Sequence, residues 1–260
     1  MDKNSLLYWF PKIKNLEIPI PRTEIIRLND NEKKEYYEGE GDFFNLDRIE
    51  REVRHLIESK FSLPVFLRTD ELSAKHSWKD TCYLNNFSEL KNHLAELVIH
   101  NKLADFLGLP LEAIVVREFI PMDTGFNAFS GEMPVNPERR YFVEDGKLLC
   151  HHAYWIEKAV EKGTLSTLLP ENWKAIVSKM NYEGEEVNLL TQYSKKVSQN
   201  VYGYWGVDFC KAKDGRWILI DMALGNDSWH PFDCPNSNMP PEEHEEEKDT
   251  DFTSLFKEKD

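Results

Sequence analysis

Two aspartates in an otherwise apolar β-hairpin constrain the fold of this chain more than any other feature. The segment YGYWGVDFCKAKDGRWILIDMAL, residues 202–224, predicts two strands joined at the turn Asp214-Gly215. Counted outward from that turn, and allowing for a slip in register, Asp208 and Asp221 lie at comparable depth on facing strands. Carboxylates in such a ladder are costly unless they are paired or bind a metal. They could hold Mg²⁺ together with nucleotide phosphates; the alternative is an ion pair with Arg140 or a lysine, or capping of nearby backbone.

A second hairpin precedes this one in the chain. The segment RRYFVEDGKLLCHHAYWI, residues 139–156, has its turn at Asp145-Gly146. Side chains alternate along a strand, so Arg139 and Arg140 must face opposite sides of it. We expect one of the two to face a core site and the other to face solvent.

The remaining elements follow from hydrophobic periodicity. Apolar residues at spacings of three and four predict a helix over 45–60 and another over 88–107, with Ser88 as a cap and Gly108 as the end. Further helices are expected within 170–200. Short β-rich runs, LPVFLR at 63–68 and EAIVVREFI at 112–120, precede or follow these helices. Helices mixed with mostly antiparallel strands predict an α+β fold built from two layers or lobes.

Cations gather in the segment FLRTDELSAKHSWKDTCYL, residues 66–84. Arg68 ends a predicted strand, and Lys75 and Lys79 lie in the loop that follows. A guanidinium fork and lysine point charges suit a polyphosphate, although solvated charges on a surface loop would look the same. Arg117 and Glu118, at the end of the strand 112–120, are equally ambiguous. That strand could offer backbone groups to a purine edge, or it could be an edge strand with a surface ion pair.

Composition excludes several classes of function. A formal net charge of −14 argues against broad binding to nucleic acid or to anionic membranes, because both require a basic face. The acidic run at 240–260 is interpreted as a solvated tail. We find neither a membrane-spanning apolar run nor a secretory signal. Together with the cysteine pattern, this predicts a cytoplasmic protein.

The cysteines and histidines give no metal signature by their spacing. The cysteines are scattered and form no CxxC pair, which favours buried thiols in a reducing cytosol over disulfides or zinc. The histidines are interpreted as packing or edge residues. The residues concerned are Cys82, Cys150, Cys210, Cys234, His76, His151 and His152.

The order of these segments resembles the ATP-grasp superfamily from about Pro19 to Trp229. It is most similar to the divergent branch that holds the cell-division-cycle protein 123 family and related phage and bacterial ATP-grasp proteins. The resemblance rests on the basic strand and loop at 66–80, on an E-x-R-x-F-V strand, and on the closing D…LID hairpin. The matching positions of the last two are Glu138, Arg140, Phe142, Val143, Asp208 and Asp221.

The resemblance implies an ATP-grasp fold of two α+β lobes, with a nucleotide cleft between antiparallel sheets, and it implies ATP and Mg²⁺ as ligands. It divides the chain into a leading segment 1–40, a smaller lobe 41–110, a larger lobe 111–235 and an acidic tail 236–260. Arg68 with Lys75 or Lys79 would contact the α- and β-phosphates. Glu118, Phe119 and Ile120 would meet adenine, Asp123 the ribose, Arg140 the γ-phosphate or an acyl phosphate, and Asp208 and Asp221 the magnesium.

The sequence departs from the family pattern at one metal position. An asparagine two positions after the final acidic residue is usual in the family, but here Asp221 is followed by Met222 and Ala223. Asn226 or Asp227 is the candidate replacement. The first basic residue is also an arginine, where many members have lysine.

The resemblance leads to two functional hypotheses of different classes. The first is an ADP-forming carboxylate–amine or carboxylate–thiol ligase that works through an acyl phosphate, with a small-molecule, peptide or protein substrate. The second is an ATP-binding assembly factor that stabilises a surface for a protein partner without turnover. A degenerate module that binds no nucleotide is the third alternative.

Overall fold

The computed structural model describes residues 2–38, 45–104, 109–129, 132–165, 168–231 and 234–237. Its residues fall into two compact units. Unit 1 comprises Met1–Phe10, Ile20–Pro121 and Phe129–Met133, and unit 2 comprises Pro11–Pro19, Met122–Ala128 and Pro134–Asp260. The predicted helix end at Gly108 and the predicted acidic tail at 240–260 lie outside the described residues.

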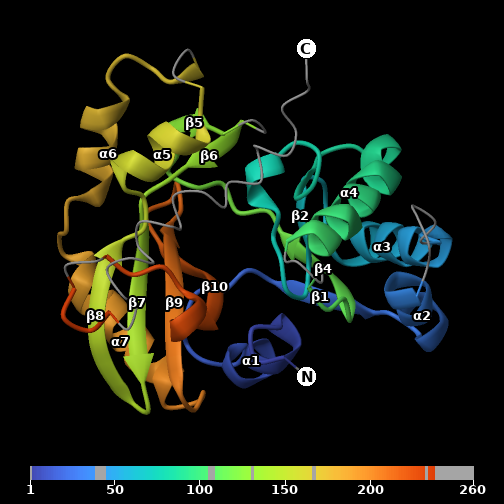
Figure 1. The fold of residues 1–260 in the computed structure, drawn as a ribbon, viewed down its shortest axis with the longest axis horizontal. Coiled ribbons are helices and arrows are strands. Elements are labelled where there is room, and N and C mark those ends of the chain that lie inside the picture. The colour runs from blue at the N-terminus through green and yellow to red at the C-terminus, as the bar shows by residue number, and fades with distance from the viewer. Residues whose placement is uncertain are drawn as a thin grey trace. The chain divides into compact units, whose positions relative to one another are not determined.

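Unit 1 is built on a four-stranded antiparallel sheet of order β1-β4-β2-β3 (Figure 1). The strands are β1 (Thr23–Arg27), β4 (Ala113–Glu118), β2 (Val65–Thr69) and β3 (Tyr83–Leu84). The helices α3 (Asp47–Lys60) and α4 (Leu90–Leu103) confirm the two helices predicted for this part of the chain. Between helices and sheet lies a core of buried aliphatic side chains, including Ile49, Val53, Leu67, Leu94 and Val116.

The predicted boundary between the lobes after residue 110 differs from the backbone pairing. β4 pairs with β1 on one side and with β2 on the other, so it is a central strand of the unit 1 sheet. Of the two alternatives left open for Arg117 and Glu118, the edge strand with a surface ion pair is therefore wrong. Arg117 is 3% exposed, and its guanidinium lies 5.9 Å from the ring centre of Trp9.

A buried aspartate joins the start of the chain to the unit 1 sheet. Asp70 is fully buried directly after β2, and its Oδ1 accepts hydrogen bonds from the amides of Glu112 and Ala113, both at 3.0 Å. Its Oδ2 accepts one from the Ser5 hydroxyl at 2.6 Å, and its carbonyl accepts one from the Leu6 amide at 2.8 Å. These bonds fix the beginning of α1 (Leu6–Ile13), a helix that the sequence did not predict. α2 (Asp30–Glu38) was also unpredicted.

Unit 2 contains the two predicted hairpins, joined into one antiparallel sheet of order β10-β9-β7-β8. The strands are β7 (Glu138–Glu144), β8 (Lys147–Ala153), β9 (Tyr204–Lys211) and β10 (Trp217–Leu224). Asp145 and Gly146 have φ angles of 44° and 85°, so the first hairpin turn needs residues that tolerate a positive φ, as the Asp-Gly pair predicts.

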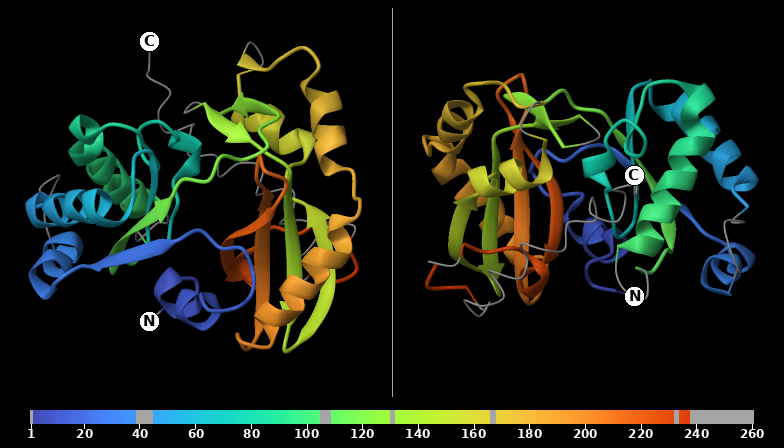
Figure 2. Two further views of the ribbon diagram at one scale, coloured as in Figure 1. Left: turned by 180° about the vertical axis from the view of Figure 1, so that it is seen from behind. Right: turned by 45° about the horizontal axis from the view of Figure 1, so that its top comes forward.

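One face of the unit 2 sheet is covered by α7 (Glu186–Ser198), which crosses β7 and β8 in the view from behind in Figure 2. Arg139 lies on this face, 1% exposed, and binds Glu186 at 3.0 Å. The expectation that one of the two adjacent arginines faces solvent is therefore wrong, because the α7 layer buries Arg139. The smaller elements are α5 (Glu157–Gly163), α6 (Trp173–Asn181) and the paired strands β5 (Phe126–Ala128) and β6 (Met133–Val135).

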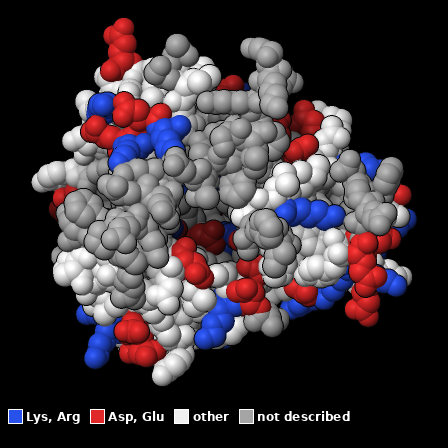
Figure 3. Space-filling model, in the orientation of Figure 1, with Lys and Arg blue, Asp and Glu red and all other residues white. Residues whose placement is uncertain are grey.

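The described surface carries charges of both signs. Acidic and basic side chains are interspersed among the described residues on the face shown in Figure 3, without a broad basic surface. None of the helices in the described part of the chain is both long and apolar enough to cross a bilayer.

We predict that Asp70→Ala lowers the free energy of unfolding by about 2–4 kcal/mol, because it leaves two buried amides and the Ser5 hydroxyl without their acceptor. Ser5→Ala should cost about 1–2 kcal/mol. Urea denaturation measures both. The control is Asp47→Ala, which removes an exposed ion pair with Lys91 and should cost less than about 0.5 kcal/mol. Equal effects of Asp70→Ala and Asp47→Ala would contradict this account of the α1 anchor.

Candidate active site

The candidate site in unit 2 is a row of polar side chains that crosses all four strands. Asp221 of β10 lies opposite Asp208 of β9, Asp208 lies opposite Arg140 of β7, and Arg140 lies opposite His152 of β8. Directly opposed residues in an antiparallel sheet share a face. The row therefore occupies the face opposite to Arg139 and α7, and it brings together three residues that the sequence analysis proposed for phosphate and metal.

Arg140 and Asp208 form a two-bonded ion pair at the centre of the row. The Nε and Nη2 atoms of Arg140 donate to the two carboxylate oxygens of Asp208, both at 2.8 Å. Burial opposes the charged form of Arg140, but the Asp208 charge and its hydrogen bonds outweigh this and raise the arginine pKa above its ordinary value. Of the alternatives that the sequence left open for Asp208, the structure shows the ion pair with Arg140.

Two further contacts hold the Arg140 guanidinium in place. It lies 4.7 Å from the ring centre of Tyr154, and Nη1 donates to the Trp229 carbonyl at 3.4 Å.

The Asp208 carboxylate has about four lone-pair positions, and its two hydrogen bonds from Arg140 use two of them. Asp208 can therefore hold Arg140 and still accept a further ligand.

Asp221 reaches its position through a β-bulge. The register of β9 and β10 shifts between Leu219 and Asp221, so that Asp221, and not Ile220, lies opposite Asp208. A bulge of this kind redirects the side chains that follow it. Asp221 is half-buried, and its Oδ1 accepts a hydrogen bond from the Met222 amide at 3.0 Å. The two carboxylates thus occupy facing positions on adjacent strands.

Two glycines let the turn after β10 pack tightly on β9. A Cβ at Gly206 would lie 2.6 Å from the Ser228 Oγ, and a Cβ at Gly225 would lie 2.3 Å from the Tyr204 ring. The turn η4 (Gly225–Asp227) carries Asn226, the predicted replacement for the usual asparagine. The structure therefore places Asn226 in a turn that is packed against β9 immediately after the strand of Asp221.

Arg68 lies on the unit 1 sheet, on the face opposite to α3 and α4. Its neighbour Leu67 belongs to the helical core, so strand alternation places Arg68 on the other face. It is 2% exposed and donates to the carbonyl oxygens of Thr69 at 3.0 Å and Glu71 at 3.3 Å. Arg117 directly follows Val116, a residue of the helical core, so it shares the Arg68 face of the sheet. Sequence reasoning did not propose Arg117 as a site residue.

The two loop lysines differ in their surroundings. Lys75 begins the short helix η1 (Lys75–Ser77). Lys79 pairs with Glu132 at 2.7 Å, and both side chains are more than half exposed, at 57% and 59%. An exposed pair of this kind contributes little to stability. Both lysines remain candidate phosphate contacts.

The proposed adenine-binding residues lie at the end of β4, with Glu118 as its last residue and Phe119 and Ile120 directly after it. The Glu118 Oε1 accepts a hydrogen bond from the Arg22 amide at 2.8 Å. The centre of the Phe119 ring lies 5.1 Å from that of Tyr83 and 6.4 Å from that of Trp78. Ile120 is half-buried. Asp123 belongs to unit 2, where its amide donates to the Lys211 carbonyl at 2.9 Å.

Sequence reasoning missed one cluster in unit 2. Cys150 and His152 come together with His230 and Cys234, although the sequence analysis treated the cysteines as unrelated thiols and His152 as a packing residue. One available signal was the spacing of Cys150 and His152, because residues two apart on a strand share a face.

A carboxyl group beside Arg68 generates a prediction about pH. Burial raises the pKa of Glu71 from 4.5 to about 8, repulsion by Asp70 and Asp2 adds to this, and Arg68 partly offsets it. An acid with a raised pKa in the folded state contributes stability at low pH that is lost as the pH rises. For Glu71, this contribution to stability is lost between about pH 4.5 and about pH 8.

Glu71→Gln should therefore leave stability nearly unchanged at pH 4.5 and raise it at pH 9, by about 1–2 kcal/mol after allowance for partial exposure. Denaturant unfolding at the two pH values measures the difference. Glu58→Gln, at an exposed position on α3, is the control and should show no such pH dependence. A gain at pH 4.5 equal to that at pH 9 would refute the raised pKa.

Comparison with known proteins places the fold. Comparison with curated protein sequences gives no significant match. C-terminally truncated Cdc123 from Schizosaccharomyces pombe is similar in structure, with a TM-score of 0.51 and 16% identity over 85% of this chain and 82% of that one. D-alanine–D-alanine ligase from Bacillus anthracis, solved with ATP, gives a TM-score of 0.45 and 12% identity over 85% of this chain and 55% of the ligase.

The sequence itself matches a family model of the ATP-grasp domain, family 3 of the R-2-K clade, over residues 53–242. This range is most of the chain and contains both the basic strand β2 and the hairpin of Asp208 and Asp221. The chain therefore belongs to this third family of the R-2-K clade of ATP-grasp domains and has the ATP-grasp fold.

Proposed function

We propose that this chain binds ATP with Mg²⁺ and catalyses the ADP-forming ligation of a carboxylate to an amine. The observation that carries the proposal is the row of Asp221, Asp208 and Arg140 on one face of the unit 2 sheet. Two carboxylates on adjacent strands, beside a fixed guanidinium, suit a divalent cation that is shared with phosphate oxygens.

The donor set fits magnesium. Asp221 has a half-buried carboxylate, and Asp208 keeps acceptor capacity beyond its two bonds to Arg140. Asn226 is our candidate for a third oxygen ligand. When bound, Mg²⁺ would neutralise phosphate charge.

The protein residues would act mainly by positioning and by neutralising charge, which is what phosphoryl transfer requires. Arg140, fixed by Asp208 and Tyr154, would orient the γ-phosphate and then the acyl phosphate. Arg68 with Lys75 or Lys79 would bind the α- and β-phosphates. Glu118, Phe119 and Ile120 would bind adenine, and Asp123 the ribose.

The proposed reaction has two steps, phosphoryl transfer and then acyl transfer. A carboxylate oxygen of the substrate attacks the γ-phosphorus, the bond to the β-phosphate oxygen breaks, and ADP leaves. An amine then attacks the acyl carbon, phosphate departs, and the amine loses a proton. We propose a peptide or protein as the acceptor. We also propose a reducing, cytoplasmic location, which is supported by the lack of a disulfide among the four cysteines, all of which lie in the described residues.

The alternative is an ATP-binding assembly factor without ligase turnover. It rests on the resemblance to the cell-division-cycle protein 123 family, whose likeness to this chain in structure concerns the fold alone. Release of ADP and phosphate distinguishes the two hypotheses. A ligase releases both only when a suitable carboxylate and amine are present, whereas an assembly factor binds ATP and releases little of either.

We predict that Asp221→Asn weakens the binding of MgATP at least about tenfold, because it removes one of two charged metal ligands. Isothermal titration calorimetry of the full chain measures this. The matched control is Asp214→Asn, in the turn of the same hairpin, where Asp214 pairs with the exposed Arg216. Asp214→Asn should bind MgATP as the wild type does.

Two results would contradict the proposed site. If the wild type binds no MgATP, the proposed nucleotide function fails. If Asp221→Asn binds MgATP as tightly as Asp214→Asn does, Asp221 is not a metal ligand.

A further inference from the structure

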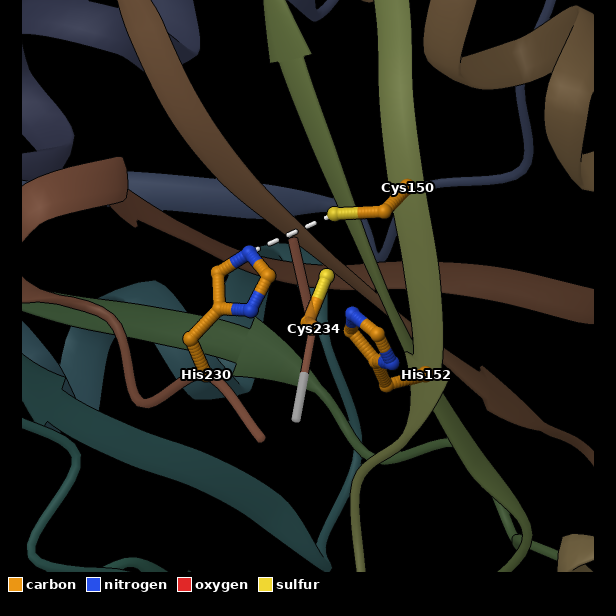
Figure 4. Close-up of side chains that lie close together, drawn as sticks. All are labelled: Cys150, His152, His230 and Cys234. Carbon is orange, nitrogen blue, oxygen red and sulfur yellow. Dashed lines mark hydrogen bonds between the residues drawn. The ribbon is translucent and has the colours of Figure 1, made fainter. Parts of the chain in front are cut away.

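Two cysteines and two histidines converge in unit 2, in a group that the ligase proposal does not use. Cys150, His152, His230 and Cys234 each direct one ligand atom toward the others (Figure 4), and these four atoms all lie within 4.8 Å of one another. The Cys150 Sγ lies 3.3 Å from the His230 Nε2. Both histidine rings and both thiols therefore border the same small space.

The backbone explains why these four side chains meet. Cys150 and His152 are two residues apart on β8, lie opposite Phe142 and Arg140 of β7, and so share one face of the sheet. His230 and Cys234 come from the segment after β10. The Cys234 amide donates to the Pro231 carbonyl at 3.0 Å, and this bond holds Cys234 close to His230.

The cluster is held in place by packing around it. His230 is 1% exposed and stacks on Phe142, with ring centres 3.9 Å apart, and its ring centre lies 5.0 Å from that of His152. Asn236 donates a hydrogen bond to the Leu149 carbonyl at 3.2 Å, which ties the end of the segment to β8. The ligand atoms are therefore positioned by contacts outside the cluster, as in a preorganised metal site.

The four side chains are ligands that zinc prefers. Two thiolates and two imidazoles are the ligands of a structural zinc site, with bonds of about 2.3 Å to sulfur and 2.0–2.1 Å to nitrogen. A tetrahedron with these bonds has edges of roughly 3.3–3.8 Å. The 3.3 Å between the Cys150 Sγ and the His230 Nε2 falls within this range. All four ligand atoms lie within 4.8 Å of one another, so a small contraction of the cluster would complete the tetrahedron. A Zn²⁺ ion with two thiolates is also neutral overall, which suits a site where His230 is buried and the other three ligands are half-buried.

We propose that Cys150, His152, His230 and Cys234 form a tetrahedral Zn²⁺ site that ties the segment after β10 to the edge strand β8. All four positions of the ion are filled by protein, so the role of this site is structural and not catalytic. His152 lies opposite Arg140, and the Trp229 carbonyl, which accepts from Arg140, immediately precedes His230. The zinc thus fixes the backbone on one side of the Arg140–Asp208 pair.

The ligand spacing explains why this site does not resemble a standard zinc motif in sequence. One pair is C-x-H on a strand, and the other is H-x₃-C, eighty residues later. Neither pair alone defines a site. A disulfide between Cys150 and Cys234, or a thiol–imidazole hydrogen bond without metal, would use some of the same atoms, so the experiment must distinguish these arrangements.

The test is metal analysis of the full chain, produced without a polyhistidine tag and desalted. Inductively coupled plasma mass spectrometry should find about one zinc ion per chain in the wild type. Cys234→Ser should reduce this to background, whereas Cys82→Ser, which changes a buried free thiol in unit 1, should keep the wild-type content. Cys234→His restores a zinc ligand and should retain the metal, which separates lost coordination from a failure to fold.

A spectroscopic readout checks the ligands directly. Cobalt exchanged into the wild type should give the strong visible bands of a tetrahedral site and a sulfur-to-metal charge-transfer band, and Cys234→Ser should lose that band. The proposal is overturned if the wild type carries no zinc, if Cys234→Ser keeps it, or if mass spectrometry of the unreduced chain finds a Cys150–Cys234 disulfide.

Discussion

The ion pair between Arg140 and Asp208 organises the face of the unit 2 sheet that carries the candidate site. It joins the two hairpins across β7 and β9, with two hydrogen bonds of 2.8 Å between largely buried groups. Removing one partner of such a pair leaves an uncompensated charge and is strongly destabilising. The pair also sets the electrostatics of the face, because it fixes a cation beside the Asp221 carboxylate and neutralises one of two neighbouring acids. A phosphate group and its metal would enter an arrangement that is already oriented.

The sequence predicted those helices and strands that depend mainly on residues close together in the chain. Both hairpins form where Asp-Gly pairs supply the turn, and α3 and α4 form where apolar residues recur at helical spacing. The features that were missed depend on distant partners. The start of α1 is fixed by Asp70, 65 residues from Ser5, and Arg117 is buried because β4 becomes a central strand. Sequence periodicity contains neither piece of information.

In the candidate site, too, the sequence indicated individual residues but not the features that depend on distant partners. Asp208 and Asp221 were proposed because carboxylates in apolar strands are costly. Arg68 was proposed because it lies in a segment rich in cations, and Arg140 because of the resemblance to the ATP-grasp superfamily. The bulge that places Asp221 opposite Asp208 is a register choice that the sequence does not specify. The Cys/His cluster was missed because the spacing within each pair is unremarkable, and because His230 meets Cys150 only after the second hairpin has packed against the first. The structure therefore adds a proposed zinc site to a face that was already assigned to phosphate.

The central claim is that the Asp208 and Asp221 carboxylates hold the metal of a bound nucleotide. A crystal structure of the full chain with Mg²⁺ and a non-hydrolysable ATP analogue tests it most directly. The account predicts a magnesium ion at about 2.0–2.1 Å from an oxygen of Asp221, of Asp208 or of both, with phosphate oxygens completing its coordination. A nucleotide whose metal is bound by other residues, or a crystal that takes up no nucleotide at saturating concentration, would contradict it.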